Sequence, residues 1–164
     1  MNSKIITYGQ AANIINIYRK DGKNVVLSHG CFDVIHAGHV VSFREAKSRG
    51  DVLFVGLEND ETICLNKGKD RPFHTLAERL DFLSELNCID YVFGFPKLID
   101  FKNTKEFEKR YAKLSPTSIA ISEWDPFRNI KEIQCKNTNI QPIILTQRTQ
   151  HSTTKILNLF GAEN

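Results

Sequence analysis

Five short runs of apolar, largely β-branched residues constrain the fold of this chain more than any other feature. They are VVLSH (25–29), DVLFVGL (51–57), YVFGF (91–95), SIAIS (118–122) and PIILT (142–146). Runs this continuous are typical of strands that are buried on both faces, as in a parallel sheet. Because parallel neighbours need a long crossover, the intervals between the runs should hold helices.

Helical patterns do occupy these intervals. Residues 38–51 place apolar side chains at helical spacing, with Gly50 as a C-terminal stop. Thr75 and Glu78 predict a capping box at the start of a helix with leucines along one face. Similar patterns predict helices in 8–20, 104–114 and 152–160. The segment 64–74 is polar, basic and interrupted by Gly and Pro, which predicts a mobile loop.

The alternation of strand and helix predicts an α/β fold with right-handed crossovers. We expect a Rossmann-like, three-layer α/β/α domain around a five-stranded parallel sheet. A leading helix would occupy 1–22 and the core 23–160. The 164 residues suit a single domain, 1–164, better than two.

Composition excludes several classes of partner. The net charge of +3 suits an anionic small molecule and is far short of a nucleic-acid-binding stripe. The four cysteines are too widely spaced for a C-x-x-C site, so we expect free thiols in a reducing compartment. Neither a signal peptide nor a long apolar run is visible. We therefore expect a cytoplasmic protein that binds neither nucleic acid nor a membrane.

The stretch GCFDVIHAGH (30–39) follows the first predicted strand, where open parallel sheets bind their ligands. Gly30 permits a close backbone approach, and Gly38 lets the chain turn tightly into a helix that begins at His39. The N-terminal end of such a helix attracts anions, and His36 and His39 can donate hydrogen bonds to phosphate oxygens. A solvated helix face explains the H-x-x-H spacing equally well.

A zinc site is a third interpretation of this stretch. It offers mixed ligands that zinc accepts, namely His29, Cys31, Asp33, His36 and His39. However, the first three can alternate along one side of a strand while the last two lie past the turn. No second ligand pair elsewhere completes a familiar zinc pattern. We therefore favour an anion site and expect no metal bound by the protein itself.

The same stretch resembles the G-x-F-D-x-x-H-x-G-H signature of the cytidylyltransferase-like nucleotidyltransferase superfamily. Further segments resemble that superfamily in the right order, at 44–51, 67–83 and 151–156. The resemblance spans about residues 23–160. It implies that a phosphate oxygen of an acceptor attacks the α-phosphorus of a nucleoside triphosphate and that pyrophosphate leaves. Mg²⁺, held mainly by the triphosphate, would assist.

The resemblance also implies the site residues. The catalytic residues would be His36, His39 and Lys47, which would bind phosphate oxygens and stabilise transition-state charge. The nucleotide-binding residues would be Gly30, Cys31, Phe32, Gly38, Asp125, Ser152, Thr153 and Thr154. The acceptor-binding residues would be Asp33, Arg71, Arg79 and Trp124. Asp33 would orient the turn or contact the acceptor and would not act as a base, because phosphate nucleophiles are already ionised.

Local chemistry allows other roles for several of these residues. The hydroxyls of 152–154 can cradle phosphates or simply cap the last helix. Arg71 can close over a ligand with its loop or face water, and Arg79 on its own would face water. Trp124 can stack on a ring or be buried in the core.

Two positions depart from the family pattern. In ISEWDPF (121–127), Glu123 and Trp124 replace glycines that family members generally carry after the fourth strand. After the second strand, Glu58 is larger than the usual polar residue. These differences bear on base recognition and on acceptor binding.

Within the superfamily, the chain is most similar to adenylyltransferases of the heptose 1-phosphate type. The shared features are 30–39, LEND (57–60), KGKDRP (67–72) and STTKI (152–156). This similarity implies ATP, a sugar 1-phosphate acceptor, an ADP-sugar product for surface polysaccharide or lipopolysaccharide core, and a homodimer. The alternatives are a glycerol-3-phosphate cytidylyltransferase that uses CTP, an FAD synthetase that uses FMN, and a nucleotide-binding protein that has lost turnover.

Overall fold

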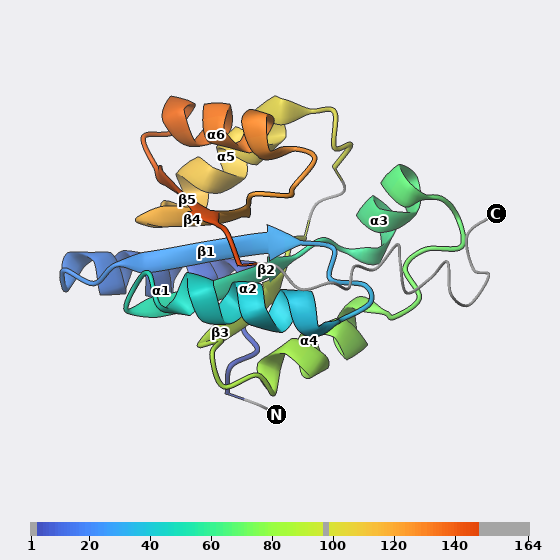
Figure 1. Ribbon diagram of the computed structural model, residues 1–164, viewed down its shortest axis with the longest axis horizontal. Helices are drawn as coiled ribbons and strands as arrows, with labels where there is room; N and C mark the ends of the chain where they lie inside the picture. The colour runs from blue at the N-terminus through green and yellow to red at the C-terminus, as the bar shows by residue number, and fades with distance from the viewer. Residues whose placement is uncertain (1–2, 97–98, 148–164) are drawn as a thin grey trace.

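The computed structural model describes residues 3–96 and 99–147. Within them, five strands form one parallel sheet in the order β3-β2-β1-β4-β5 (Figure 1). The strands are β1 (Val25–Gly30), β2 (Val52–Leu57), β3 (Tyr91–Gly94), β4 (Ser118–Ser122) and β5 (Gln141–Leu145). The predicted fold class and all five predicted strands are thereby confirmed.

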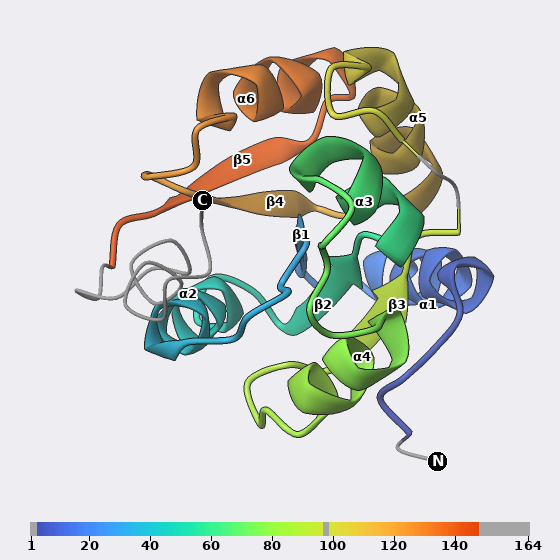
Figure 2. The same ribbon diagram turned by 90° about the vertical axis from the view of Figure 1, so that its right-hand side faces the viewer.

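Helices cover both faces of the sheet. The described helices are α1 (Tyr8–Lys20), α2 (Ala37–Lys47), α3 (Asp60–Lys67), α4 (Leu76–Ser84), α5 (Thr104–Leu114) and α6 (Arg128–Asn137). α1, α5 and α6 pack on one face, and α2 and α4 pack on the other. Figure 2 shows α3 lying across the C-terminal ends of the strands.

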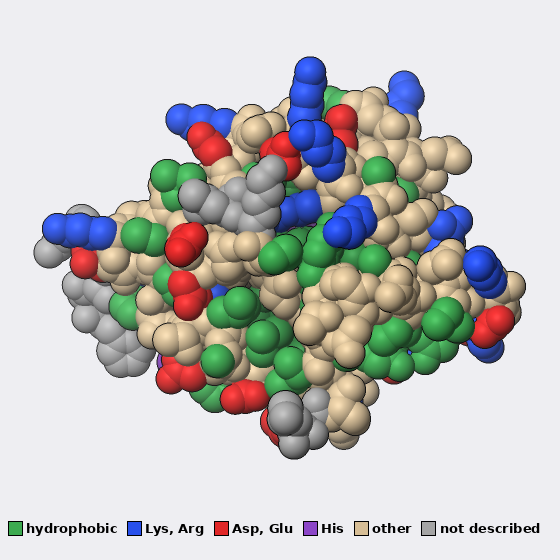
Figure 3. All heavy atoms as spheres, turned by 180° about the vertical axis from the view of Figure 1, so that it is seen from behind, with side chains coloured by type: hydrophobic (Ala, Val, Ile, Leu, Met, Phe, Trp, Pro, Cys, Tyr) green, Lys and Arg blue, Asp and Glu red, His purple; other side chains and the backbone are tan. Residues whose placement is uncertain are grey.

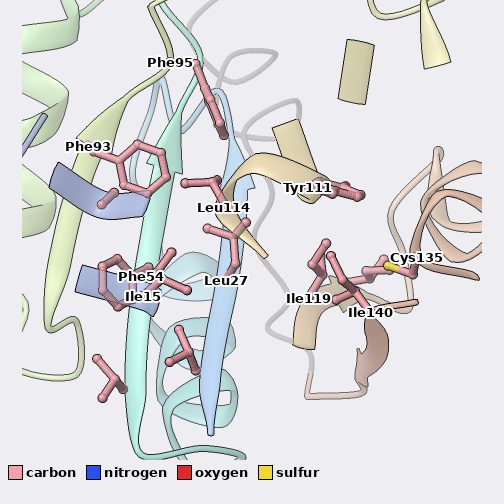
Figure 4. Packing of buried hydrophobic residues seen from close by; sticks show 14 residues of the cluster. Ile15, Leu27, Phe54, Phe93, Phe95, Tyr111, Leu114, Ile119, Cys135 and Ile140 are labelled. Atoms are coloured by element: carbon pink, nitrogen blue, oxygen red, sulfur yellow. The ribbon is translucent and has the colours of Figure 1, made fainter. Parts of the chain in front are cut away.

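The core explains why the strand sequences are continuously apolar. Val25 and Leu27 of β1 belong to the cluster beneath α1, α5 and α6, whereas Val26 between them belongs to the cluster beneath α2 and α4. All three side chains are fully buried. Figure 4 shows the first cluster, in which side chains from strands and helices interlock around Leu27 and Phe54. A strand covered on both faces needs apolar residues at consecutive positions.

The surface outside this core carries charges of both signs. On the face shown in Figure 3, basic and acidic side chains are interspersed with apolar ones. No helix in the described ranges is long and apolar enough to cross a membrane.

Several helix predictions are confirmed. The helices predicted in 8–20 and 104–114 are α1 and α5, with the predicted bounds. Thr75 and Glu78 form the predicted capping box at the start of α4. The helix predicted in 152–160 lies outside the described residues.

The sequence patterns do not predict α3 or α6. α3 takes up the first part of the predicted loop 64–74 and is capped by Asn59, whose side chain accepts from the Thr62 amide at 2.7 Å. α6 is polar overall and buries only Gln134 and Cys135, so few apolar residues mark it in the sequence.

The predicted role of Gly50 is wrong. α2 ends at its C-cap residue Ser48, which keeps a right-handed helical conformation. Gly50 instead lies against the start of β1, where an added Cβ atom would be 2.8 Å from the carbonyl oxygen of Asn24 and 2.5 Å from a methyl group of Val26. The close approach of two backbone segments, not a helix stop, requires glycine there.

A buried guanidinium group joins the loops at the C-terminal edge of the sheet. Arg79 of α4 is fully buried. It donates to the carbonyl oxygens of Cys31 at 2.6 Å, Glu58 at 2.9 Å and His74 at 3.0 Å. It also forms a 2.6 Å ion pair with Asp60. The segments that follow β1 and β2 and the segment before α4 are therefore held together by one side chain.

This geometry corrects both expectations for Arg79. The side chain does not face water, and its contacts with the protein leave it outside the cavity described below. Arg79 thus supports the loops around the site and is not positioned to bind the acceptor.

The Arg79→Met variant should be strongly destabilised. Three carbonyl groups, one buried and two partly buried, would each lose a charged donor, at about 1–3 kcal/mol for a buried unsatisfied group. We expect the free energy of unfolding to fall by about 3 kcal/mol or more in urea denaturation of the ligand-free protein. The exposed Arg44, on α2, provides the matched control, because Arg44→Met should change stability by less than about 0.5 kcal/mol. Equal stability of the two variants would contradict the role assigned to Arg79.

Candidate active site

A cavity of about 510 Å³ opens at the C-terminal edge of the sheet. It is lined by the ends of β1 and β4, the start of α2, the loop after α3 and one side of α6. The predicted residues that line it are Gly30, Cys31, Phe32, Asp33, His36, Gly38, His39, Arg71, Trp124 and Asp125. The structure therefore brings together most of the predicted site, from segments far apart in the sequence.

The turn between β1 and α2 presents two histidines to the cavity. His36 is the N-cap residue of α2, and its Nδ1 atom accepts from the Gly38 amide at 3.1 Å. This bond assigns the ring proton of a neutral His36 to Nε2. The helix begins at Ala37, two residues before the predicted start at His39, because the His36 side chain provides the cap.

The two imidazole rings stack on each other. The ring centroids of His36 and His39 are 3.9 Å apart, and the edge of Phe32 packs against His39. Burial, with smaller contributions from the charges of His36 and Lys67, lowers the pKa of His39 to about 3. Its Nδ1 atom is buried without a hydrogen-bond partner in the described part of the chain. His39 is therefore neutral near pH 7 and retains bonding capacity beside the N-terminus of α2.

The loop after α3 is held by a buried carboxylate. Asp33 accepts from Nε of Arg71 at 2.6 Å and from the backbone amides of Phe73 at 2.8 Å and His74 at 3.2 Å. The guanidinium of Arg71 also lies over the ring of Phe73. Asp33 therefore holds the loop of residues 71–74, and its predicted contact with the acceptor stays a prediction. The loop predicted to be mobile is instead anchored, which keeps Arg71 at the cavity.

The structure places Lys47 away from the cavity, which corrects its predicted catalytic role. Lys47 is the last residue of α2, eight positions after His39, which corresponds to about 12 Å along a helix. Its amine forms a 2.7 Å ion pair with Asp90 and donates to the carbonyl of Asp51, near the N-terminal ends of the strands. The side chain cannot bind the same phosphate as His39.

Lys67, which the sequence analysis missed, does line the cavity. The other two cavity-lining cations are paired with carboxylates: Arg71 with Asp33, and Lys131 with Asp125 at 2.7 Å. Among the described residues, no carboxylate lies within ion-pair distance of Lys67. The available signal was the lysine at the start of KGKDRP, four residues before Arg71.

One lining residue of the cavity, Glu58, belongs to a buried ion pair. Glu58 follows β2 and is 1% exposed, and Nη1 of Arg110 contacts its two carboxylate oxygens at 2.8 and 2.9 Å. Beside this pair, the ring of His29 is hydrogen-bonded to the hydroxyl of Tyr111 at 2.6 Å. Burial lowers the pKa of His29 well below its ordinary value. Glu58 and His29 both line the cavity.

The opposite side of the cavity carries exposed aromatic side chains beside the Asp125–Lys131 ion pair. Trp124 is 55% exposed, which excludes the alternative that it is a core residue. Phe127 and Ile130 line the same side. Asp125 accepts from the Phe127 amide at 2.8 Å and from Lys131, so it shapes the turn before α6. This side can stack against a flat ring.

The chain leaving β5 is fixed by Glu45 of α2. This nearly buried carboxylate accepts from the amides of Thr146 at 3.2 Å and Gln147 at 3.0 Å. Gln147 lines the cavity. The predicted phosphate-binding residues Ser152, Thr153 and Thr154 lie outside the described residues.

The described residues do not form a metal centre of their own. No group of three His, Cys, Asp or Glu side chains converges in the ranges 3–96 and 99–147. Each carboxylate lining the cavity, from Asp33, Glu58 or Asp125, contacts a cationic side chain.

Comparison with solved structures supports the fold. The lipopolysaccharide core biosynthesis protein of Thermoplasma volcanium superposes with a TM-score of 0.59 at 21% identity, covering 78% of this chain and all of that one. The pantoate-β-alanine ligase of Francisella tularensis gives a TM-score of 0.66 at 20% identity over 89% of this chain and 68% of that one.

Comparison of sequences identifies the family. The bifunctional protein HldE of Geobacter metallireducens is 44% identical over 94 residues, which are 57% of this chain and 19% of that protein. HldE of Hydrogenovibrio crunogenus is 38% identical over 104 residues, 63% of this chain and 20% of that protein. The chain thus spans about a fifth of the length of these relatives. The cytidylyltransferase-like family model matches residues 27–159, which include the paired histidines, and the chain therefore belongs to this family of nucleotidyltransferases.

Proposed function

We propose that this protein transfers an adenylyl group from ATP to a sugar 1-phosphate of the heptose 1-phosphate type, giving an ADP-sugar and pyrophosphate. The observation that carries the proposal is the pair His36 and His39 at the N-terminus of α2, inside the cavity. Similarity to the HldE proteins and the resemblance to heptose 1-phosphate adenylyltransferases support the choice of ATP and acceptor.

The residues suit an in-line displacement. A phosphate oxygen of the acceptor forms a bond to the α-phosphorus while the bond to the bridging β-phosphate oxygen breaks, and that oxygen leaves with pyrophosphate. The nucleophile is already ionised, so no protein base is required. His36, His39 and the amides at the start of α2 would stabilise the charge that develops on the phosphoryl oxygens. Mg²⁺ would enter with the triphosphate, because the cavity carboxylates are engaged. We propose a homodimer only by analogy with the family.

The direct test is pyrophosphate release in the presence of Mg²⁺. ATP and CTP are each combined with heptose 1-phosphate, glycerol 3-phosphate and FMN. We expect a signal with ATP and heptose 1-phosphate. A signal only with CTP and glycerol 3-phosphate, or only with ATP and FMN, would keep nucleotidyl transfer and refute the proposed acceptor. Nucleotide binding by calorimetry without turnover would indicate a binding protein that has lost activity.

The His36→Ala and His39→Ala variants should each lose turnover by about 100-fold or more, the usual effect of removing one transition-state donor. Circular dichroism and thermal unfolding would show that the variants are folded. Near-normal kcat in both would remove the histidines from the mechanism.

Lys67 and Lys47 provide a matched pair of lysines. Lys67→Met removes the cavity-lining amine that no described carboxylate neutralises, and it should raise KM for ATP or lower kcat by about 10-fold or more. Lys47→Met should keep both constants within about two-fold, because this amine pairs with Asp90 outside the cavity. The opposite ranking of the two variants would restore the role predicted for Lys47 from the sequence.

The low pKa of His39 has a measurable consequence. Because burial disfavours the charged ring, its NMR signals should not titrate between pH 8 and pH 5 in the ligand-free protein. The unfolded state binds this proton with a pKa near 6.5, so the contribution of His39 to stability is present above that value and is lost as the pH falls toward about 3. A titration midpoint near 6.5 in the folded protein would contradict this description of the site.

A further inference from the structure

Glu58 is held in the cavity more rigidly than a solvated carboxylate. Its backbone amide donates to the carbonyl of Gly30 at 3.0 Å, and its own carbonyl accepts from Arg79 at 2.9 Å. The side chain is 2% exposed and still lines the cavity. The carboxylate therefore faces the ligand space from a fixed position directly after β2.

Arg110 favours the ionised form of this carboxylate. Nη1 of Arg110 contacts the two oxygens of Glu58, and the guanidinium lies 4.2 Å from the ring centroid of Phe95 and 5.4 Å from that of Phe107. Burial raises the pKa of Glu58, and the charge of Arg110 opposes that rise. A buried pair of this kind is seldom better for stability than apolar residues of the same size. Its position at the cavity therefore points to a role in binding.

The carboxylate also has unused acceptor capacity. An ionised carboxylate can accept about four hydrogen bonds. In the described part of the chain, Nη1 of Arg110 is the donor that reaches Glu58. The remaining lone pairs of the Glu58 carboxylate can accept from a ligand. In a phosphorylated polyol, the groups that can donate such hydrogen bonds are hydroxyls.

The two sides of the cavity suit different substrates. Glu58, Lys67 and Arg71 lie on the side of β2 and α3, whereas Trp124 and Phe127 lie on the side of β4 and α6. The histidines of α2 stand between the two sides at the site proposed for the transferred phosphate. A flat base can stack on the aromatic side chains of Trp124 and Phe127. This leaves the side with Glu58 for the polar acceptor.

We propose that Glu58, held by Arg110, accepts hydrogen bonds from hydroxyl groups of the acceptor and thereby selects a polyhydroxylated phosphate ester. This inference rests on the proposed function and assigns a specificity-determining residue to its acceptor. It also gives a reason for the departure from the family pattern at this position, because Glu58 both pairs with Arg110 and lines the cavity directly after β2.

The test compares steady-state constants of the wild type and Glu58→Gln. We expect KM for the acceptor to rise by about 10- to 100-fold, the range for loss of a hydrogen bond to a charged group. KM for ATP should change by less than about two-fold. Glu61→Gln, an exposed carboxylate three residues further on, is the matched control and should leave both constants unchanged.

Acceptor analogues separate direct contact from a structural effect. Removing the contacted hydroxyl from the acceptor should weaken wild-type binding by about 10-fold and should have little effect on Glu58→Gln binding. The double variant Glu58→Gln/Arg110→Gln, which leaves no unpaired buried charge, keeps the test valid if the single variant unfolds. Equal sensitivity of wild type and variant to every deoxy analogue would overturn the inference.

The outcomes also distinguish this inference from the proposed function. If the wild type uses only glycerol 3-phosphate or FMN, the heptose proposal fails, and the same comparison with that acceptor still decides the role of Glu58. If calorimetry detects no binding of any polyol phosphate to the wild type, with or without a non-hydrolysable ATP analogue, the acceptor role of Glu58 is refuted.

Discussion

The site depends on how buried charges hold the loops at the C-terminal edge of the sheet. Backbone groups that leave a parallel strand there lose their ladder partners, and a buried group without a partner is costly. Here side chains supply those partners: Arg79 donates to carbonyl groups of three segments, and Asp33 accepts from two amides of the loop before α4. The cavity walls are therefore organised by the protein itself before a ligand enters.

Buried ion pairs gather at this edge, among them Asp33 with Arg71 and Glu58 with Arg110. Desolvation of such pairs costs several kcal/mol for each ion, and this cost can exceed the attraction between the charges. Apolar residues would serve stability as well. The pairs instead fix charged groups in definite places, and a fixed charge needs no reorganisation when a phosphate group arrives.

The sequence predicts what depends on local pattern and misses what depends on distant partners. The strands are recognisable because burial on both faces, as in β1, requires continuous apolar sequence. The histidines are recognisable because the stretch 30–39 leads from the end of a strand through a turn into a helix. Glu58 and Arg110 are 52 residues apart, and nothing in either neighbourhood indicates that they pair. Arg79 has the same difficulty, because an arginine on an amphipathic helix usually faces water.

The family resemblance predicts a phosphate-binding role for Lys47 and does not indicate Lys67. Helix geometry alone argues against the role of Lys47. A helix rises about 1.5 Å for each residue, so a side chain at the far end of α2 cannot return to the first turn. Lys67 reaches the cavity because α3 lies across the ends of the strands and directs its last turn toward the site. In a parallel α/β fold, a lysine can thus contact the ligand only if its segment lies at the C-terminal ends of the strands.

The charge balance of the cavity determines which kind of anion it can bind. In the ligand-free protein, the low pKa of His39 keeps its ring neutral near pH 7. Two of the three lining cations form ion pairs with Asp33 and Asp125. Much of the positive charge is therefore already balanced, and a polyphosphate would meet Lys67, helix amides and hydrogen-bonding rings. Such a site favours negative charge that is spread over several oxygens. Nucleotidyl transfer, the reaction of this family, develops charge of this kind on the phosphoryl oxygens.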